Sequence, residues 1–101
     1  MPRIRVGPLS LLPPGTAAQV TADGREIALC HAEDGVYAID GVCPHRNGPL
    51  GQGALHGHAV VCPWHAWEFD CRTGQHDMQP SLRLRTYKVV IEGGDIFVEL
   101  P

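Results

Sequence analysis

The amino-acid sequence predicts an all-β domain with antiparallel strands, and its turn residues and alternating segments support this. Gly supplies 12 and Pro 9 of the 101 residues, whereas roughly 12% would be expected for the two together. Such a high content of turn-forming residues leaves little room for long helices. Most other segments are short and alternate apolar with polar residues, which is typical of strands with one buried face.

Three predicted strands lie in the first half of the chain. Residues 16–20 and 25–31 flank an Asp23-Gly24 turn, and residues 36–39 follow an Asp34-Gly35 turn. Near the C-terminus, the alternating segments 87–92 and 96–100 are joined by Gly93-Gly94. Both glycines can adopt positive φ, so this pair predicts a tight hairpin.

The middle of the chain differs from its two ends, because it is rich in Gly, Pro and His. Only brief strands are expected there, at residues 59–61 and 68–71. We interpret the chain as a single domain, 1–101, with a β base formed by residues 1–41 and 82–101. Residues from about 42 to 81 would form a smaller subdomain that carries the functional site, since sites commonly lie on loops held by a rigid sheet.

Composition excludes several classes of function. The formal net charge is −3 and no basic stripe is present, so we expect no nucleic-acid partner. No apolar stretch approaches the ~18 residues of a membrane span. Pro8, Pro13 and Pro14 interrupt the N-terminal segment, which argues against a signal peptide and predicts a cytoplasmic protein with no membrane partner.

Two segments of similar layout carry the candidate metal ligands. The first is Cys43-Pro44-His45 and the second is Cys62-Pro63-Trp64-His65. Each would contribute one thiolate and one imidazole, which together make a four-ligand set. A structural zinc site uses the same atoms, but its usual order is two cysteines followed by two histidines. A cysteine-nucleophile enzyme is a weaker alternative, because one Cys/His pair needs no second copy.

These segments resemble the cluster-binding loops of the Rieske iron–sulfur family. The family pattern is Cys-x-His followed, after a short interval, by Cys-x-x-His. Residues 43–50, Cys-Pro-His-Arg-Asn-Gly-Pro-Leu, are similar to the first loop of the soluble members, and residues 62–70 are similar to the second. A Thr73-Gly74 turn and a Tyr87-containing strand pair also fall where the family has them. The resemblance covers most of residues 16–100 and implies the Rieske fold, with an antiparallel sandwich or barrel base.

The resemblance implies one Rieske-type [2Fe–2S] cluster as the cofactor. Cys43 and Cys62 would bind the inner iron, and His45 and His65 would bind the outer iron through Nδ1. Two thiolates and two neutral imidazoles leave the oxidised cluster formally neutral and the reduced cluster singly negative. Four thiolates would instead give a dianion and a trianion. Histidine ligation therefore raises the reduction potential.

The other two cysteines, Cys30 and Cys71, lie in predicted strands. We expect them to be inert buried thiols rather than a disulfide, because the chain is predicted to be cytoplasmic.

The remaining histidines carry no motif. His56 and His58 flank Gly57 at a predicted hairpin tip and are expected to be solvated, and His31 and His76 are expected at the surface.

Trp64 and Trp67 bracket His65 and could pack the small subdomain, shield the cluster or contact a partner. Pro80 is interpreted either as part of the family's loop over the cluster or as an ordinary turn proline.

Two departures from the respiratory members of the family affect the expected potential. Those proteins have one additional cysteine in each loop, and the two form a disulfide; here Gly48 and Trp64 occupy comparable positions. They also place a hydroxyl shortly after the second histidine ligand, where this chain has Ala66 and Trp67. Fewer hydrogen bonds to the cluster sulfurs predict a midpoint near the low end of the Rieske range, about −150 mV.

The sequence contains neither a further domain for a mononuclear oxygenase iron nor a nucleotide-binding glycine motif. We therefore expect an electron carrier without catalysis of its own, which takes electrons from a flavoprotein reductase and passes them to a terminal oxygenase. One alternative is a component like the small subunit of an assimilatory NAD(P)H nitrite reductase, whose cluster-binding loops have similar sequences. Another is a redox or structural metal-binding module with no fixed partner.

Overall fold

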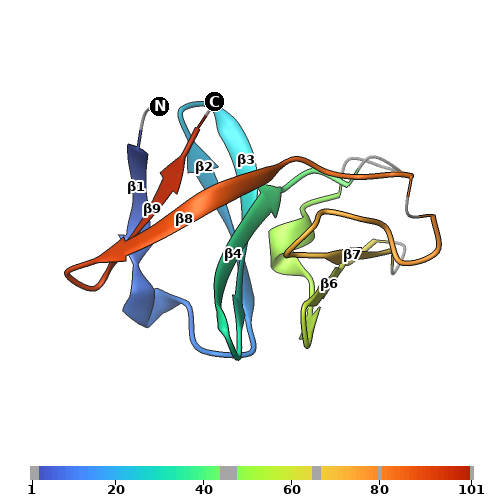
Figure 1. The fold of residues 1–101 in the computed structure, drawn as a ribbon, viewed down its shortest axis with the longest axis horizontal. Helices are drawn as coiled ribbons and strands as arrows, with labels where there is room; N and C mark the ends of the chain where they lie inside the picture. Colours follow the sequence, from blue (N-terminus) through green and yellow to red (C-terminus); the bar gives the residue numbers. More distant parts are fainter. Residues whose placement is uncertain (1–2, 44–47, 65–66, 80, 101) are drawn as a thin grey trace.

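The computed structural model describes residues 3–43, 48–64, 67–79 and 81–100, which form two antiparallel sheets. The larger sheet has the strand order β1-β9-β8-β4-β3-β2, and the smaller has the order β5-β6-β7. In Figure 1 the larger sheet lies on the left and the smaller one on the right. The strands are β1 Arg3–Pro8, β2 Ala17–Ala22, β3 Arg25–Ala32, β4 Gly35–Asp40, β5 Leu55–His56, β6 Ala59–Val61, β7 Glu68–Asp70, β8 Thr86–Glu92 and β9 Asp95–Glu99.

The helical content of the described residues is limited to two short 3₁₀ turns, η1 Leu9–Leu11 and η2 Leu50–Gln52. The described part of the chain has no helix of the length and apolar character that a membrane crossing requires. The predicted all-β class is confirmed, and the site is built on strands and on the loops between them.

The turn predicted at Asp23-Gly24 and the tight hairpin predicted at Gly93-Gly94 are both found in the larger sheet. The β2–β3 turn has Asp23 at φ 51° and Gly24 at φ 79°, and the β8–β9 turn has Gly93 at φ 59° and Gly94 at φ 82°. Two consecutive residues at positive φ match the right-handed twist of the strands that they connect. Turn chemistry therefore fixes both registers locally.

The larger sheet curls toward a closed barrel. β4 and β8 pair only at Ala38↔Tyr87 and Ile39↔Thr86, so β8 leaves β4 early and crosses to β9 (Figure 1). The edge strands β1 and β2 contact each other. β1, which was not predicted from the sequence, pairs with β9.

The buried apolar residues form two separate cores. One fills the curled sheet and includes Ile27, Leu29, Ile96 and Val98. The other lies where the two sheets meet and contains all four cysteines, Cys30, Cys43, Cys62 and Cys71, together with Phe69, Leu50 and Val60. Cys43 and Cys62, the two candidate ligands that the structure describes, thus belong to the second core, which is common to both sheets.

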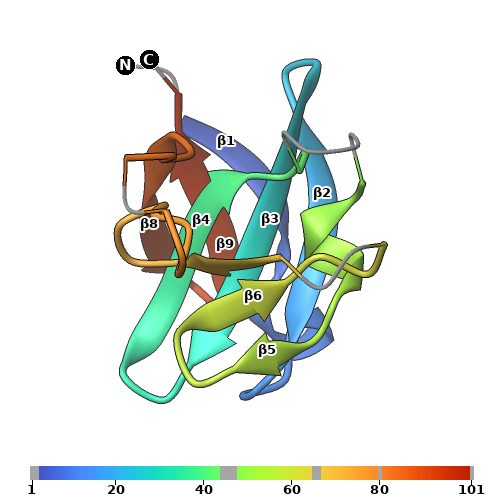
Figure 2. The ribbon, with the colours of Figure 1, turned by 90° about the vertical axis from the view of Figure 1, so that its right-hand side faces the viewer.

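The smaller sheet begins with a hairpin that turns at Gly57, where φ is 64°. The predicted hairpin tip is therefore confirmed, although β5 itself was not predicted. The expected strand at residues 59–61 is found as β6, and the expected strand at 68–71 is β7, which ends at Asp70. Figure 2 views the molecule from this end, with β5 and β6 in front of the larger sheet.

Candidate metal centre

Two of the four predicted ligands, Cys43 and Cys62, are described by the structure. Cys43 follows the end of β4, and Cys62 follows β6 directly. Their exposed fractions are 0% and 1%. His45 and His65 lie outside the described residues. The described half of the ligand set therefore consists of two thiol groups kept away from water.

Each candidate ligand cysteine closes its own loop through its backbone N–H. The Cys43 N–H donates to the carbonyl of Gly48 at 2.8 Å, and the Cys62 N–H donates to the carbonyl of Trp67 at 2.7 Å. The predicted histidine ligands fall between these residue pairs in the sequence. Both loops are consequently closed by a main-chain hydrogen bond at the residue that would bind iron.

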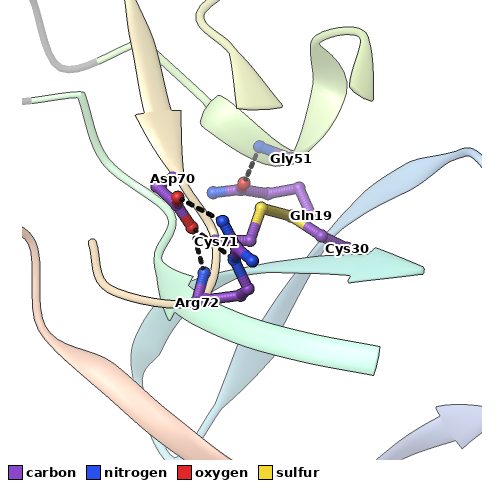
Figure 3. The surroundings of a disulfide bond; sticks show 6 residues. All are labelled: Gln19, Cys30, Gly51, Asp70, Cys71 and Arg72. Atoms are coloured by element: carbon purple, nitrogen blue, oxygen red, sulfur yellow. Dashed lines mark hydrogen bonds and ion pairs between the residues drawn. A yellow bond between two sulfur atoms is a disulfide. The ribbon is translucent and has the colours of Figure 1, made fainter. Parts of the chain in front are cut away.

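The first loop is also held at its two ends by Gln19 of β2. The Gln19 side-chain amide donates to the Gly41 carbonyl at 2.9 Å and accepts from the Gly51 N–H at 2.8 Å (Figure 3). A Cβ at Gly41 would lie 2.6 Å from Gln19 Nε2, and one at Gly51 would lie 2.5 Å from the backbone of Ala18. Glycine at both positions therefore allows the loop to lie directly on β2.

Asp40, the last residue of β4, fixes the point where the chain leaves the larger sheet toward Cys43. Its carboxylate accepts from the Tyr87 hydroxyl at 2.6 Å and from the Arg85 N–H at 3.0 Å. Burial, assisted by the hydrogen bond to Asp40, raises the pKa of the Tyr87 hydroxyl. Tyr87 thus remains a protonated donor to this carboxylate at neutral pH.

The two loops meet at Gly48. A Cβ at this position would lie 3.0 Å from Cys62 Sγ and 3.2 Å from the Trp64 ring. The two residues that replace the respiratory-type cysteines, Gly48 and Trp64, are therefore adjacent in space. A thiolate from each loop at a dry junction is a soft donor set suited to an iron–sulfur cluster, so the described residues fit this cofactor.

The expectation for Cys30 and Cys71 was wrong, because the structure joins them in a disulfide (Figure 3). Cys30 belongs to β3, and Cys71 directly follows β7. Their Cα atoms lie 6.6 Å apart, although the residues are 41 positions apart in sequence. The prediction rested on the expected compartment, whereas the pairing depends on the packing of the two sheets, which no local sequence pattern reveals.

A polar contact accompanies the disulfide at the junction of the two sheets. His58 Nε2 lies 2.8 Å from Asp34 Oδ1, and the Tyr37 hydroxyl donates to Asp34 Oδ2 at 3.1 Å. The hydrogen bond with His58 holds the pKa of Asp34 below its usual value. The His58 carbonyl also accepts the Cys71 N–H at 2.7 Å. His56 is exposed as expected, but His58 connects the two sheets and is not a freely solvated turn residue.

The two tryptophans beside the second loop differ in their exposure to solvent. Trp64 is 58% exposed, whereas Trp67 is half-buried and packs against the shared core. His76 lies against Trp67 with ring centroids 4.6 Å apart and is only 7% exposed, so the expectation of a surface histidine was wrong. No motif or spacing in the sequence marks this residue. His31 is half-buried, with Nδ1 2.7 Å from the Leu12 carbonyl, and Pro80 lies outside the described residues.

Comparison with known proteins identifies the family. The family model for the Rieske [2Fe–2S] domain matches residues 3–88. The ferredoxin subunit of 3-phenylpropionate/cinnamic acid dioxygenase from Escherichia coli K12 is 39% identical, over 100% of this chain and 96% of its own length. The ferredoxin component of the naphthalene 1,2-dioxygenase system from Pseudomonas aeruginosa is 36% identical, over 88% and 86% of the two chains.

Solved structures agree with this relationship. The ferredoxin of carbazole 1,9a-dioxygenase from Nocardioides aromaticivorans superposes with a TM-score of 0.89 at 34% identity, over 100% of both chains. A ferredoxin determined in complex with the oxygenase of carbazole 1,9a-dioxygenase gives 0.84 at 27% identity, over 98% and 97% of the chains. A nitrite reductase small subunit from Mycobacterium tuberculosis gives 0.88 at 22%, over 99% and 96%, which shows a shared fold. This chain belongs to the Rieske [2Fe–2S] domain family.

Proposed function

We propose that this chain is a one-electron carrier whose Rieske-type [2Fe–2S] cluster is bound by Cys43, His45, Cys62 and His65. The observation that carries the proposal is the meeting of the two loops, with Gly48 against Cys62 Sγ and both ligand cysteines buried. Residues 42–81 act as the cluster-binding subdomain. The base, residues 1–41 and 82–101, holds the two ends of the first loop in place.

The bound cluster supplies a group that gains and loses one electron reversibly. The residues of the chain determine how readily it does so. Cys43 and Cys62 place two thiolates in an apolar core, and the imidazoles of His45 and His65 add no negative charge. The limited negative charge makes reduction easier than at an all-cysteine site, which suits a carrier. The exposed Trp64 offers an apolar contact for a docked partner beside the second loop.

The electrons pass from a flavoprotein reductase to a terminal oxygenase in the cytoplasm. Two findings support transfer to an oxygenase. Relatives with at least 36% identity are ferredoxin components of dioxygenase systems, and they match the chain over nearly its whole length. A structural neighbour forms a complex with its oxygenase. The match to a nitrite reductase small subunit, at 22% identity, supports a shared fold only. The nitrite reductase role is therefore the weaker candidate.

The first test is electron paramagnetic resonance on protein purified anaerobically and then reduced. The wild-type protein should give a Rieske-type signal, and His65→Ala should lose it because the outer iron loses a ligand. His56→Ala is the matched control and should keep the signal, since His56 is an exposed hairpin residue. A sample that contains zinc and gives no signal would refute the cluster, and a normal Rieske signal from His65→Ala would refute the ligand assignment.

The pathway is tested separately by reconstitution. A flavoprotein reductase and a terminal oxygenase should turn over substrate only when this protein is added. Stable co-purification with a large sirohaem-containing chain would favour the nitrite reductase role instead. Reduction of the cluster without turnover by either enzyme class would leave a redox module without a fixed partner.

A further inference from the structure

His76 is a buried histidine beside the second cluster-binding loop. It forms an isolated β-bridge with Phe69 of β7, and its side chain is 7% exposed. The rings of Trp67 and Phe69 lie 4.6 and 5.2 Å from it, at interplanar angles of 80° and 84°. A polar ring in such an apolar environment needs a physical reason, because phenylalanine would fill the same space at no polar cost.

The hydrogen bonds of His76 define its protonation. The backbone N–H groups of Met78 and Gln79 both donate to Nδ1, each at 3.1 Å. Nδ1 must therefore be the unprotonated nitrogen, and the ring proton resides on Nε2. Asp77 Oδ1, 3.7 Å from Nδ1, is too distant for a hydrogen bond.

The buried Nε2–H group lowers the stability of the folded protein. Nε2 is buried and has no hydrogen-bond partner among the described residues, and an unsatisfied buried donor typically costs about 1–3 kcal/mol. Packing of the ring does not explain why a histidine is present despite this free-energy cost, since a hydrocarbon ring would pack equally well. The two hydrogen bonds accepted by Nδ1 are what only the histidine provides at this position.

The two hydrogen bonds at Nδ1 close the turn at residues 76–79, and separate backbone contacts attach this turn to β7, which follows the second ligand loop. The backbone N–H of Asp77 donates to the Glu68 carbonyl at 3.1 Å, and the neighbouring Trp67 carbonyl accepts the Cys62 N–H at 2.7 Å. Trp67 is also the residue whose ring faces His76. A short chain of contacts thus runs from Nδ1, through the turn and Trp67, to a proposed iron ligand.

We propose that His76, as the neutral Nε2–H tautomer, is a positioning residue that holds the second cluster-binding loop through the hydrogen bonds at Nδ1. The inference rests on the proposed cluster at Cys43, His45, Cys62 and His65. It assigns His76 no contact with the cluster itself. Its role is to keep the turn and Trp67 fixed, so that the loop does not open and release iron.

Two variants separate this role from ring packing. His76→Phe keeps a ring of similar size but removes the acceptor. His76→Asn loses the ring but retains an acceptor atom at the position of Nδ1, where asparagine side chains commonly accept from the N–H groups two and three residues ahead. His76→Leu, which also lacks an acceptor, replaces His76→Phe if that protein fails to fold.

The test measures hydrogen exchange at the Met78 and Gln79 amides of the cluster-loaded protein, and the rate at which an iron chelator bleaches the cluster. In His76→Phe both amides should exchange faster, and bleaching should accelerate by about 10- to 100-fold, the range typical when a group supporting a metal ligand is removed. His76→Asn should stay within about threefold of wild type, because the acceptor hydrogen bonds persist.

Wild-type behaviour in His76→Phe, or equal damage in the two variants, would overturn the proposal. If the wild-type protein binds no cluster, the proposed function fails. The amide exchange comparison between His76→Phe and His76→Asn then decides the role of His76 in holding the turn.

Discussion

Gly48 lies where the two ligand loops touch, and its missing side chain is what allows their approach. Replacing it with alanine would place a Cβ 3.0 Å from Cys62 Sγ and 3.2 Å from the Trp64 ring. The loops would have to separate by a few tenths of an ångström, and overpacking of this kind typically costs about 1–3 kcal/mol. We expect Gly48→Ala to release iron to a chelator about tenfold faster or more, measured as loss of cluster absorbance.

Gly57→Ala is the matched control for this substitution. Gly57 sits at the tip of the β5–β6 hairpin with φ 64°, and a Cβ there would meet no atom within 4 Å. Alanine should cost about 1 kcal/mol through its backbone conformation alone and leave the release rate unchanged. Equal release rates for Gly48→Ala and wild type would show that the loops tolerate the extra methyl group.

Asp34 gives a prediction about pH. Its hydrogen bond with His58 is the main reason that its pKa lies below the usual 3.8. A lowered folded-state pKa contributes stability that is present above the unfolded value and is lost as the pH falls through the folded value. Asp34→Asn should therefore lower the urea midpoint at pH about 5 to 7, and the difference from wild type should shrink as the pH falls below about 4.

A His58→Ala background provides the control for this pH effect. Asp34→Asn should have a smaller effect there, because the largest cause of the lowered pKa is already absent. Solvent exposure of the pair will reduce the size of the difference. A difference that persists unchanged at low pH would exclude the carboxylate as its source.

At the scale of the structural elements, the Cys30–Cys71 disulfide links β3 of the larger sheet to the end of β7 in the smaller one. It closes a loop spanning 41 positions, so in the chain-entropy model it should stabilise the protein by about 4 kcal/mol. We expect the double substitution Cys30→Ala/Cys71→Ala to lower the free energy of unfolding by up to about that amount. Chemical denaturation without reductant measures it.

Alkylation followed by mass spectrometry tests the disulfide directly. In unreduced, denatured protein without its cluster, only Cys43 and Cys62 should react, whereas all four cysteines should react after reduction. Alkylation of all four cysteines without reductant would mean that Cys30 and Cys71 are thiols. In that case the double substitution should cost only the packing of two small side chains.

At the scale of the whole molecule, the reduction potential depends on the environment that the protein provides for the cluster. The sequence has no hydroxyl at Ala66 or Trp67, and the structure packs Trp67 against Phe69 and His76. Because neither position supplies a hydroxyl donor to the cluster sulfurs, we expect a midpoint below zero, near about −150 mV. We expect reduction of the cluster to take up no proton near neutrality, so the midpoint should not change between pH about 6 and 8.

A redox titration followed by electron paramagnetic resonance at several pH values measures both quantities. A midpoint well above zero would require donors to the sulfurs that the two loops do not supply by sequence. A strong dependence on pH near neutrality would mean that a ligand imidazole loses its proton on oxidation.

Local sequence determined the parts of this protein that depend on neighbouring residues. The Asp23-Gly24 and Gly93-Gly94 turns, with φ values from 51° to 82°, have conformations set by side chains within the turn itself. Alternation likewise identified the buried residues Ile96 and Val98 of β9. The ligand pattern indicated the family because each loop holds its cysteine and histidine within a few residues of each other.

Only the tertiary structure decided which distant residues meet. Packing of the small sheet on the large one joins Cys30 to Cys71 and brings His58 to Asp34. Contacts within the smaller subdomain bury His76 against Trp67, and pairing with β9 makes a strand of the proline-flanked β1. None of these contacts follows from residues adjacent in the sequence, since each arises from the free energy of burying two surfaces together. That free energy cannot be estimated from composition or residue spacing. The sequence therefore predicted the candidate ligand loops but not the long-range contacts that hold them.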